Sequence, residues 1–236
     1  MAVASRLEQP DTVREGHDRP DPVGTGLEGV LDALRALRPG GSAGPGAPVC
    51  CTWVCRVVAG EVHDRGRAAP AAEPGREFET VLVRRLVHRY LRVVADAAAG
   101  RPVARAWELL LDPPAAPPAR LALAGVRTLL AYDLTLAFAS TCTVLGRTPG
   151  PRERAAHARV AARLGACAGE LAGRTGGPAD VAAAAALDGP ARREAARRRA
   201  ESLWSLRGRP SEAEAERDAL DREVHAAALR QLAGDG

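Results

Sequence analysis

A single carboxylate within an apolar segment is the feature of the sequence with the clearest chemical potential. Asp133 lies in the middle of residues 121–145, LALAGVRTLLAYDLTLAFASTCTVL, the most apolar stretch of the chain. Leu129, Leu130 and Leu136 share its helix face, so we expect the carboxylate to be buried. A buried carboxylate requires a cation or hydrogen-bond donors. Two interpretations stay open: an Asp–Arg pair that joins two helices, or a pocket acid or base with a shifted pKa.

The partners expected for Asp133 come from an arginine-rich segment, residues 78–99, which has the periodicity of a helix. Its core stripe follows the spacing i, i+4, i+7 and i+11 and consists of Val83, Val87, Tyr90 and Val94. Arg89 and Tyr90 lie at the edge of this stripe, and we expect them to point inward towards Asp133. The remaining arginines are interpreted as a solvated face. His88 lies on that face, so a surface imidazole is favoured over a catalytic one.

Arg127 and the tryptophans are further candidates for contact with a ligand. Arg127 lies six positions before Asp133, about 240° around the helix, so the two side chains do not share a face. We expect Arg127 to extend outward, with substrate binding as the alternative. The indoles of the chain belong to Trp53, Trp107 and Trp204. Core anchoring is the favoured role for each, and the alternative, for Trp53 and Trp107 above all, is the lining of a ligand pocket.

Several kinds of chemistry are excluded or disfavoured by missing residues. The sequence contains no lysine, which excludes Schiff-base chemistry and covalently attached pyridoxal phosphate. It also has no phosphate-binding or dinucleotide-binding glycine loop and no metal-ligand spacing of histidines or cysteines. We therefore expect neither a cofactor nor a metal. Three histidines have a carboxylate four residues away and are interpreted as local ion pairs: His17 with Asp21, His157 with Glu153, and His225 with Asp221.

The composition favours an all-α protein from a GC-rich genome. Of the 236 residues, 46% are hydrophobic and only 3% are aromatic, so the core must consist of Ala, Leu and Val. Lysine, isoleucine and asparagine, whose codons are AT-rich, are all absent, which indicates an actinobacterial source. Five cysteines without a regular pattern are interpreted as reduced thiols, and no signal peptide is recognisable, so we predict a cytoplasmic protein.

Charge and hydropathy argue against nucleic-acid and membrane partners. The net charge is +4, and the densest basic cluster, residues 192–199, is interrupted by Glu194 and contains no aromatic residue. A charged helix face is therefore favoured over nucleic-acid binding. Residues 121–145 are long enough to cross a bilayer, but Arg127 and Asp133 would each cost about 2.5–3.5 kcal/mol near its centre. We predict a buried core helix instead.

The predicted elements form an irregular, single-domain bundle of about eight helices. Helices are expected over residues 27–37, 49–63, 78–99, 107–111, 118–145, 151–171, 180–187, 190–207 and 211–232. Residues 1–24 are predicted to be a disordered tail, 25–207 the all-helical domain, and 208–236 a C-terminal helix and tail. Two capping boxes indicate helix starts, Thr25 with Glu28 and Ser211 with Glu214. The last helix is expected either to pack on the domain or to be swapped onto a partner, which would make a homodimer.

Three runs of residues follow the motif order of a known family. They are RRLVHRYLRVVADAAAGRPVARAWELLL (84–111), LALAGVRTLLAYDLTLAFA (121–139) and ARREAARRRAESLWSL (191–206). Together they resemble the actinobacterial family named domain of unknown function 5995. Its members show an N-R-Y helix, an R-P-x-x-R-x-W turn and helix, a G-x-N-A-H-I-N-x-D-L helix and a terminal R-x-x-A-W helix.

The resemblance covers residues 27–207 and includes both matches and departures. The matching residues are Arg89, Tyr90, Arg101, Pro102, Arg105, Trp107, Gly125, Asp133, Leu134 and Trp204. His88 replaces the family's first Asn, and Leu129 replaces its His. Arg127 and Ala131 occupy its two other Asn positions. The chain is therefore interpreted as a divergent member whose polar motif is lost, or is rebuilt around Arg127 and Asp133 for another ligand.

These observations predict a cofactor-free, metal-free enzyme of natural-product biosynthesis, of the cyclase, isomerase or dehydratase type. Its pocket is expected between the long apolar helix and the helix of Arg89 and Tyr90. Asp133 would act as acid, base or charge stabiliser, and Tyr90 as proton donor. Arg89 would fix a carboxylate or enolate of a small-molecule substrate. The alternative is a non-catalytic small-molecule-binding or helper protein that has lost the family's polar motif.

Overall fold

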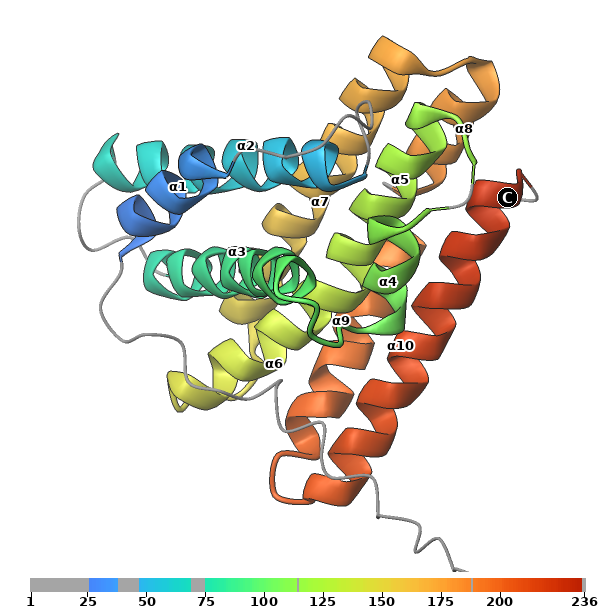
Figure 1. Ribbon diagram of the computed structural model, residues 1–236. Helices are drawn as coiled ribbons and strands as arrows, with labels where there is room; N and C mark the ends of the chain where they lie inside the picture. Colours follow the sequence, from blue (N-terminus) through green and yellow to red (C-terminus); the bar gives the residue numbers. More distant parts are fainter. Residues whose placement is uncertain (1–25, 38–46, 69–74, 114, 188, 235–236) are drawn as a thin grey trace, which may run out of the picture.

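A continuous helix from Pro118 to Val144 runs through the middle of the molecule. It consists of α5 (Pro118–Thr128), the π-helical turn η1 (Leu129–Asp133) and α6 (Leu134–Val144). The computed structural model describes residues 26–37, 47–68, 75–113, 115–187 and 189–234, and in it the other helices surround this one (Figure 1). By length and composition the helix could cross a membrane, yet 89% of its most apolar window is buried inside the protein. Neighbouring helices therefore cover its apolar side chains.

The first three helices cover one side of the central helix. They are α1 (Leu27–Ala36), α2 (Ala47–Ala68) and α3 (Arg76–Ala98). α2 packs on α5, α3 packs on α6, and α1 contacts both α2 and α3. Figure 1 shows α1, α2 and α3 lying across the direction of α7 (Pro151–Thr175) and α10 (Pro210–Ala233). This crossing brings the middle of α3 close to η1.

The remaining helices enclose the central helix from other directions. α7 packs on α5 and α3 and contacts the short α8 (Pro178–Leu187), while α9 (Pro190–Ser205) lies against α6. The short helix α4 (Arg105–Leu111) contacts α10, α5 and α2. α10 packs on α4 and α5 of the same chain, which is the first of the two arrangements expected for it. Its buried residues include Leu220, Val224, Ala228 and Leu232.

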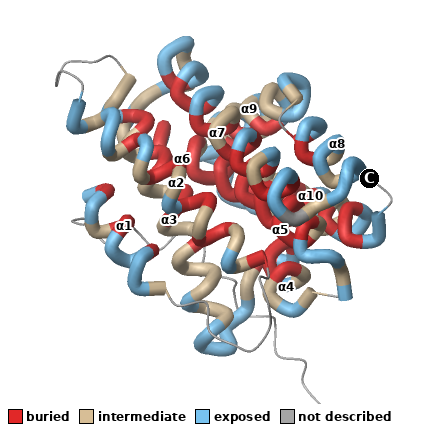
Figure 2. Tube along the Cα trace, turned by 90° about the horizontal axis from the view of Figure 1, so that it is seen from above, coloured by how far each residue is buried: buried red, intermediate tan, exposed pale blue. Residues whose placement is uncertain are grey.

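The core consists largely of small aliphatic side chains, as the low aromatic content requires. Figure 2 shows the buried residues concentrated where the helices face one another, with exposed residues on the outer sides. One contact between helices depends on the absence of a side chain. A Cβ atom at position 125 would lie only 2.6 Å from the sulfur of Cys51, so α2 and α5 can pack this closely because the residue is Gly125.

The predicted all-α fold class is confirmed, with differences at the helix ends. All nine predicted segments are helical, and the described ranges contain no strand. α2 is longer than the predicted 49–63, because the Asp64–Gly66 turn signal does not end it. α10 begins at Pro210, so Ser211 lies inside its first turn and the predicted capping box there is wrong. The tail 1–24 and Thr25 lie outside the described residues.

Candidate functional site

The predicted site residue Asp133 is the last residue of the π-helical turn. Leu129, Leu130 and Tyr132 of the same turn are buried, and Asp133 is completely inaccessible to solvent. A π turn inserts one extra residue into a helix and shifts the directions of the side chains that follow, and such turns are frequent at functional sites. Here the turn lies in the segment that faces α3, α9 and α10. The expectation that Asp133 is buried is therefore fulfilled.

Both oxygens of the Asp133 carboxylate accept a hydrogen bond. The indole Nε1 of Trp107 donates to Oδ2 at 2.9 Å, and Nε of Arg89 donates to Oδ1 at 3.2 Å. The carboxylate thus joins α4 and α3 to the central helix. Burial raises the pKa of Asp133 to about 6 from an ordinary value of 3.8, although Arg89 and Trp107 both act to lower it. A carboxyl group with this pKa gains and loses its proton near neutral pH.

Arg89 connects the buried carboxylate to solvent. Its side chain is 21% exposed, whereas Asp133 has no exposed surface at all. The guanidinium also lies 5.7 Å from the centre of the Tyr132 ring, a favourable cation–π distance. Burial raises the pKa of Tyr132, and Arg89 partly opposes this rise, so the phenol stays neutral. Arg89 therefore links the buried carboxylate to the protein surface.

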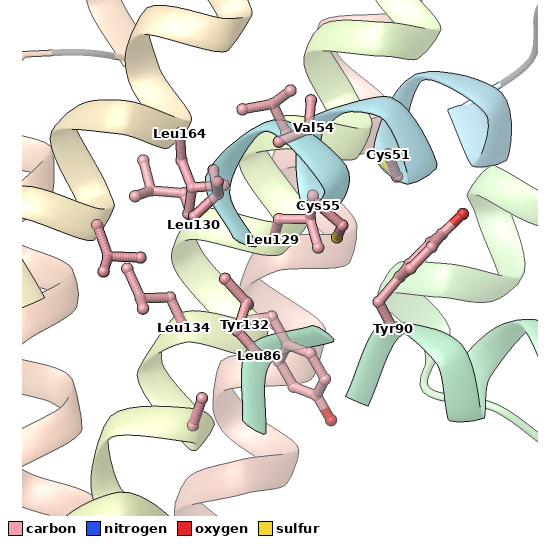
Figure 3. Packing of buried hydrophobic residues seen from close by; sticks show 14 of the residues in the cluster. Cys51, Val54, Cys55, Leu86, Tyr90, Leu129, Leu130, Tyr132, Leu134 and Leu164 are labelled. Atoms are coloured by element: carbon pink, nitrogen blue, oxygen red, sulfur yellow. The ribbon is translucent and has the colours of Figure 1, made fainter. Parts of the chain in front are cut away.

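Tyr90 lies beside this cluster, but its hydroxyl binds to α2 and not to Asp133. The hydroxyl donates to the carbonyl oxygen of Pro48 at 2.6 Å and shares a hydrogen bond of 2.7 Å with Oγ1 of Thr52. Its ring packs 5.6 Å from the Trp107 ring. In Figure 3 the hydroxyls of Tyr90 and Tyr132 point in different directions. The inward orientation predicted for Arg89 and Tyr90 thus brings only Arg89 into hydrogen-bond contact with Asp133.

Cysteine side chains and apolar residues fill the space behind Tyr90 and Asp133. Cys51 and Cys55 are completely buried and belong to the same apolar cluster as Leu129 (Figure 3). Burial raises the pKa of both thiols well above the ordinary value, and the charge of Asp133 raises it further. They are therefore neutral core side chains and not nucleophiles. Among the described residues, no group of three or more His, Cys, Asp or Glu side chains could hold a metal ion.

A carboxylate from the last helix fixes the position of Trp107. Asp221 of α10 accepts hydrogen bonds from the backbone N–H groups of Arg105 at 3.1 Å and Ala106 at 3.0 Å, at the start of α4. His225 forms a hydrogen bond of 2.9 Å through Nδ1 to the carbonyl oxygen of Arg105. The local ion pair predicted for Asp221 and His225 is therefore wrong, because both side chains bind the backbone at the start of α4. Ala104 at the N-cap position was the available signal, because it has no side-chain acceptor of its own.

The second predicted histidine pair is also replaced by other contacts. His157 is buried with its ring edge-on to Phe138, at 5.2 Å between ring centres. Burial lowers its pKa to about 4, so the imidazole is neutral. Glu153 instead accepts a hydrogen bond from the backbone N–H of Gly150 at the start of α7. The third predicted pair, His17 with Asp21, lies outside the described residues.

The other predicted ligand-binding residues do not contact Asp133. Arg127 is half-buried and donates to the carbonyl oxygen of Ala227 in α10 at 3.4 Å. Burial and the nearby charges of Arg192 and Arg230 lower its pKa to about 10. Arg127 therefore packs beneath α10 and does not extend freely into solvent.

Trp53 and His88 also lie outside the hydrogen-bonded cluster of Asp133. Trp53 is half-buried on α2, with the guanidinium of Arg174 from α7 lying 5.5 Å from its ring centre. His88 is half-buried on α3, one residue before Arg89. The structure thus unites Asp133, Arg89 and Trp107 in one hydrogen-bonded cluster, with Tyr90 packed against it.

The residues of this cluster lie within the segment of the chain that a family model matches. A family model described as a family of unknown function (DUF5995) matches residues 61–233. The match starts in α2, later than the resemblance at residue 27 indicated, and continues through α10 to include Asp221. No curated protein and no solved structure matches the chain. The family model covers well over half of the sequence, and the chain belongs to the DUF5995 family.

Proposed function

We propose that this protein is a cofactor-independent enzyme that moves protons on a small organic substrate, with Asp133 as the acid or base. One observation carries the proposal. Asp133 is a fully buried carboxyl group with a pKa of about 6, and it is hydrogen-bonded to a partly exposed guanidinium. A general acid or base is most effective when its pKa lies close to the working pH.

Each residue of the cluster has a distinct role in this proposal. Arg89 binds a carboxylate or a developing enolate, because its guanidinium has donors beyond the Nε that Asp133 engages. Trp107 positions Asp133 and limits how far its pKa rises. Tyr90 positions the cluster through Thr52 and Pro48, which revises the role of proton donor expected from the sequence. Substrate access requires Arg89 to move, because Asp133 has no exposed surface.

The proposed reaction class is cyclisation, isomerisation or dehydration of a natural-product intermediate in the cytoplasm. Each of these reactions needs proton transfer and charge stabilisation without an electron acceptor or an activated phosphate. The actinobacterial composition of the sequence favours this metabolic setting. The small molecule is the partner proposed for the site, in preference to a nucleic acid or a membrane.

A non-catalytic binding or helper protein is the second candidate, and one observation favours it. Both Asp133 oxygens and the Tyr90 hydroxyl already have partners within the chain. A fully satisfied network of this kind is what a purely structural buried ion pair requires. Leu129 and Ala131, which occupy family His and Asn positions, would also be consistent with loss of an activity.

The experiment that separates the two candidates compares metabolites in a host strain and in its gene deletion, by liquid chromatography with accurate mass. The deletion is complemented with the wild-type gene, with Asp133→Asn, and with Arg152→Gln as a control on an exposed residue outside the site. A lost product that is isomeric with its precursor, or differs from it by one water, supports an enzyme. Restoration by Arg152→Gln but not by Asp133→Asn assigns the role to Asp133.

Two other outcomes would contradict the proposed enzymatic function. Full complementation by Asp133→Asn removes Asp133 from the mechanism. An unchanged metabolite profile in the deletion strain favours the binding protein. The abundance of each variant is measured in the same extracts, so that loss of product is not confused with loss of protein.

A further inference from the structure

A second group of charged side chains lies where α5, α9 and α10 meet, and it consists of Arg127, Arg192 and Arg230. Arg127, in the last turn of α5, donates from Nη1 to the carbonyl oxygen of Ala227 in α10 at 3.4 Å. Arg230 follows Ala227 by three residues, so the two are neighbours on the surface of α10. We call these three arginines the arginine cluster.

The packing of α9 brings Arg192 to the same place. Arg192 lies in the first turn of α9, and this helix contacts both η1 and α10. One turn after Arg192, the carbonyl oxygen of Ala196 lies 3.5 Å from Oγ1 of Thr135, just after η1. Arg192 and Arg230 are near enough to Arg127 for their charges to lower its pKa.

Within the part of the chain that the structure describes, no carboxylate pairs with the arginine cluster. α5 contains no acidic residue, and α10 contains none after Glu223. The first carboxylate of α9 belongs to Glu194, which binds Arg197 instead. The first turn of α9 has no acidic residue either, although a helix start favours negative charge. The surroundings of the cluster are therefore suited to an anion that the chain itself does not supply.

Arg127 is the member of the cluster whose charge is costly to the fold. Its guanidinium is half-buried, and its Nε is buried without a hydrogen-bond partner among the described residues. Other half-buried arginines, such as Arg89 and Arg163, are held by carboxylates. A partly buried charge without a counter-ion destabilises a folded protein. An anion bound from outside would supply the counter-ion that Arg127 lacks.

We propose that the arginine cluster binds the phosphate group of a small soluble ligand. Guanidinium groups donate hydrogen bonds in a planar fork that matches the oxygens of a phosphate. Nη1 of Arg127 is engaged by Ala227 and its Nε is buried, so Nη2 is the donor left for the ligand. A doubly charged phosphate balances more of the three positive charges than one carboxylate would. The Asp133 cluster contains none of these arginines, so neither proposal depends on the other.

Isothermal titration calorimetry with inorganic phosphate on the full chain, at constant ionic strength, tests this site. The wild-type protein should bind one phosphate saturably. Arg192→Gln should weaken the affinity roughly ten- to hundredfold, as expected for loss of one charge-assisted contact. Arg192 is exposed, so this variant keeps the fold. The control Arg56→Gln removes the same charge from an exposed position on α2 and should leave the affinity unchanged.

A second variant, Arg127→Met, separates a binding role from a structural one. Methionine keeps an apolar side chain at this position and removes the half-buried charge. Without phosphate, urea unfolding should therefore find the variant at least as stable as the wild type. Added phosphate should stabilise the wild type and not the variant, because only a folded state that binds the ligand gains stability from it.

Four results would overturn the proposal. Phosphate heat that does not saturate would exclude a site. Equal phosphate affinity in Arg192→Gln and the wild type would place the phosphate elsewhere. An Arg127→Met variant that is less stable than the wild type, yet binds phosphate as tightly, would leave Arg127 with only the structural role of joining α5 to α10. Acetate serves as the second titrant, and acetate binding as tight as phosphate binding would show that the cluster selects carboxylates.

Discussion

Replacement of Asp133 by asparagine is expected to remove a specific component of the pH dependence of stability. In the folded protein, burial raises the pKa of Asp133 to about 6 from an ordinary value of 3.8. The native state therefore binds this proton more tightly than the unfolded state does. Stability from this group is complete below the unfolded pKa and is lost as the pH rises through the folded pKa. Asparagine is similar in shape and does not ionise, so the Asp133→Asn variant does not lose stability in this way as the pH rises.

The magnitude follows from the two pKa values. A tenfold change in proton affinity corresponds to about 1.4 kcal/mol, so complete ionisation of Asp133 should cost the native state about 3 kcal/mol. At pH 4 the unfolded carboxyl group is already more than half ionised, so about 2.4 kcal/mol of this cost falls between pH 4 and pH 8. The free energy of unfolding of Asp133→Asn, relative to the wild type, should rise by this amount over the same range. Other carboxylates titrate in both proteins and largely cancel in the difference.

Urea unfolding followed by circular dichroism at pH 4, 5, 6, 7 and 8 measures this difference directly. A difference that is constant across the range would refute the raised pKa. A difference that falls with increasing pH would show that the ion pair with Arg89 outweighs burial. In the second case Asp133 would be a permanently ionised structural residue, and the proposed acid–base role would lose its physical basis.

Three further substitutions test the packing that surrounds the site, each by urea unfolding. Gly125→Ala should lower the free energy of unfolding by about 1–3 kcal/mol, because its Cβ would lie 2.6 Å from the Cys51 sulfur. The control Gly169→Ala has open space around it and should raise the free energy of unfolding by at most about 1 kcal/mol. Equal effects of the two substitutions would contradict the close contact at Gly125. Asp221→Ala should cost about 2–3 kcal/mol by uncapping α4, and a neutral result would mean that water replaces the carboxylate. Tyr90→Phe should lower the free energy of unfolding by about 1–2 kcal/mol, because the hydroxyl contacts to α2 are lost. A loss of activity in a variant that is still fully folded would instead support the role of Tyr90 as proton donor.

Hydrophobic periodicity predicts which face of a helix is buried, and this was enough to locate the central part of the site. The burial of Asp133 follows from its apolar neighbours, and its pairing with Arg89 follows from the edge position of Arg89 beside a core stripe. The positions of all nine helical segments follow from the same patterns, with Pro and Gly at their boundaries.

The remaining details depend on contacts between residues far apart in the sequence. The hydrogen bond from Trp107 to Asp133 requires the position of α4, which depends on the carboxylate of Asp221 in the last helix. The π-helical turn leaves no pattern in the residue types, because its residues are as apolar as those of an ordinary helix. The orientation of the Tyr90 hydroxyl was equally hidden, because its acceptor is the backbone carbonyl of Pro48.

The dependence of α4 on Asp221 has a consequence for how the protein is made. Asp221 and the backbone groups that it caps are separated by 115 and 116 residues in the chain. During synthesis the central helix, Arg89 and Trp107 all leave the ribosome long before α10 does. The start of α4 then has unpaired N–H groups, and the indole that holds Asp133 is not yet fixed. The buried carboxylate therefore receives its final environment only when the last helix docks, which makes this docking a late step of folding.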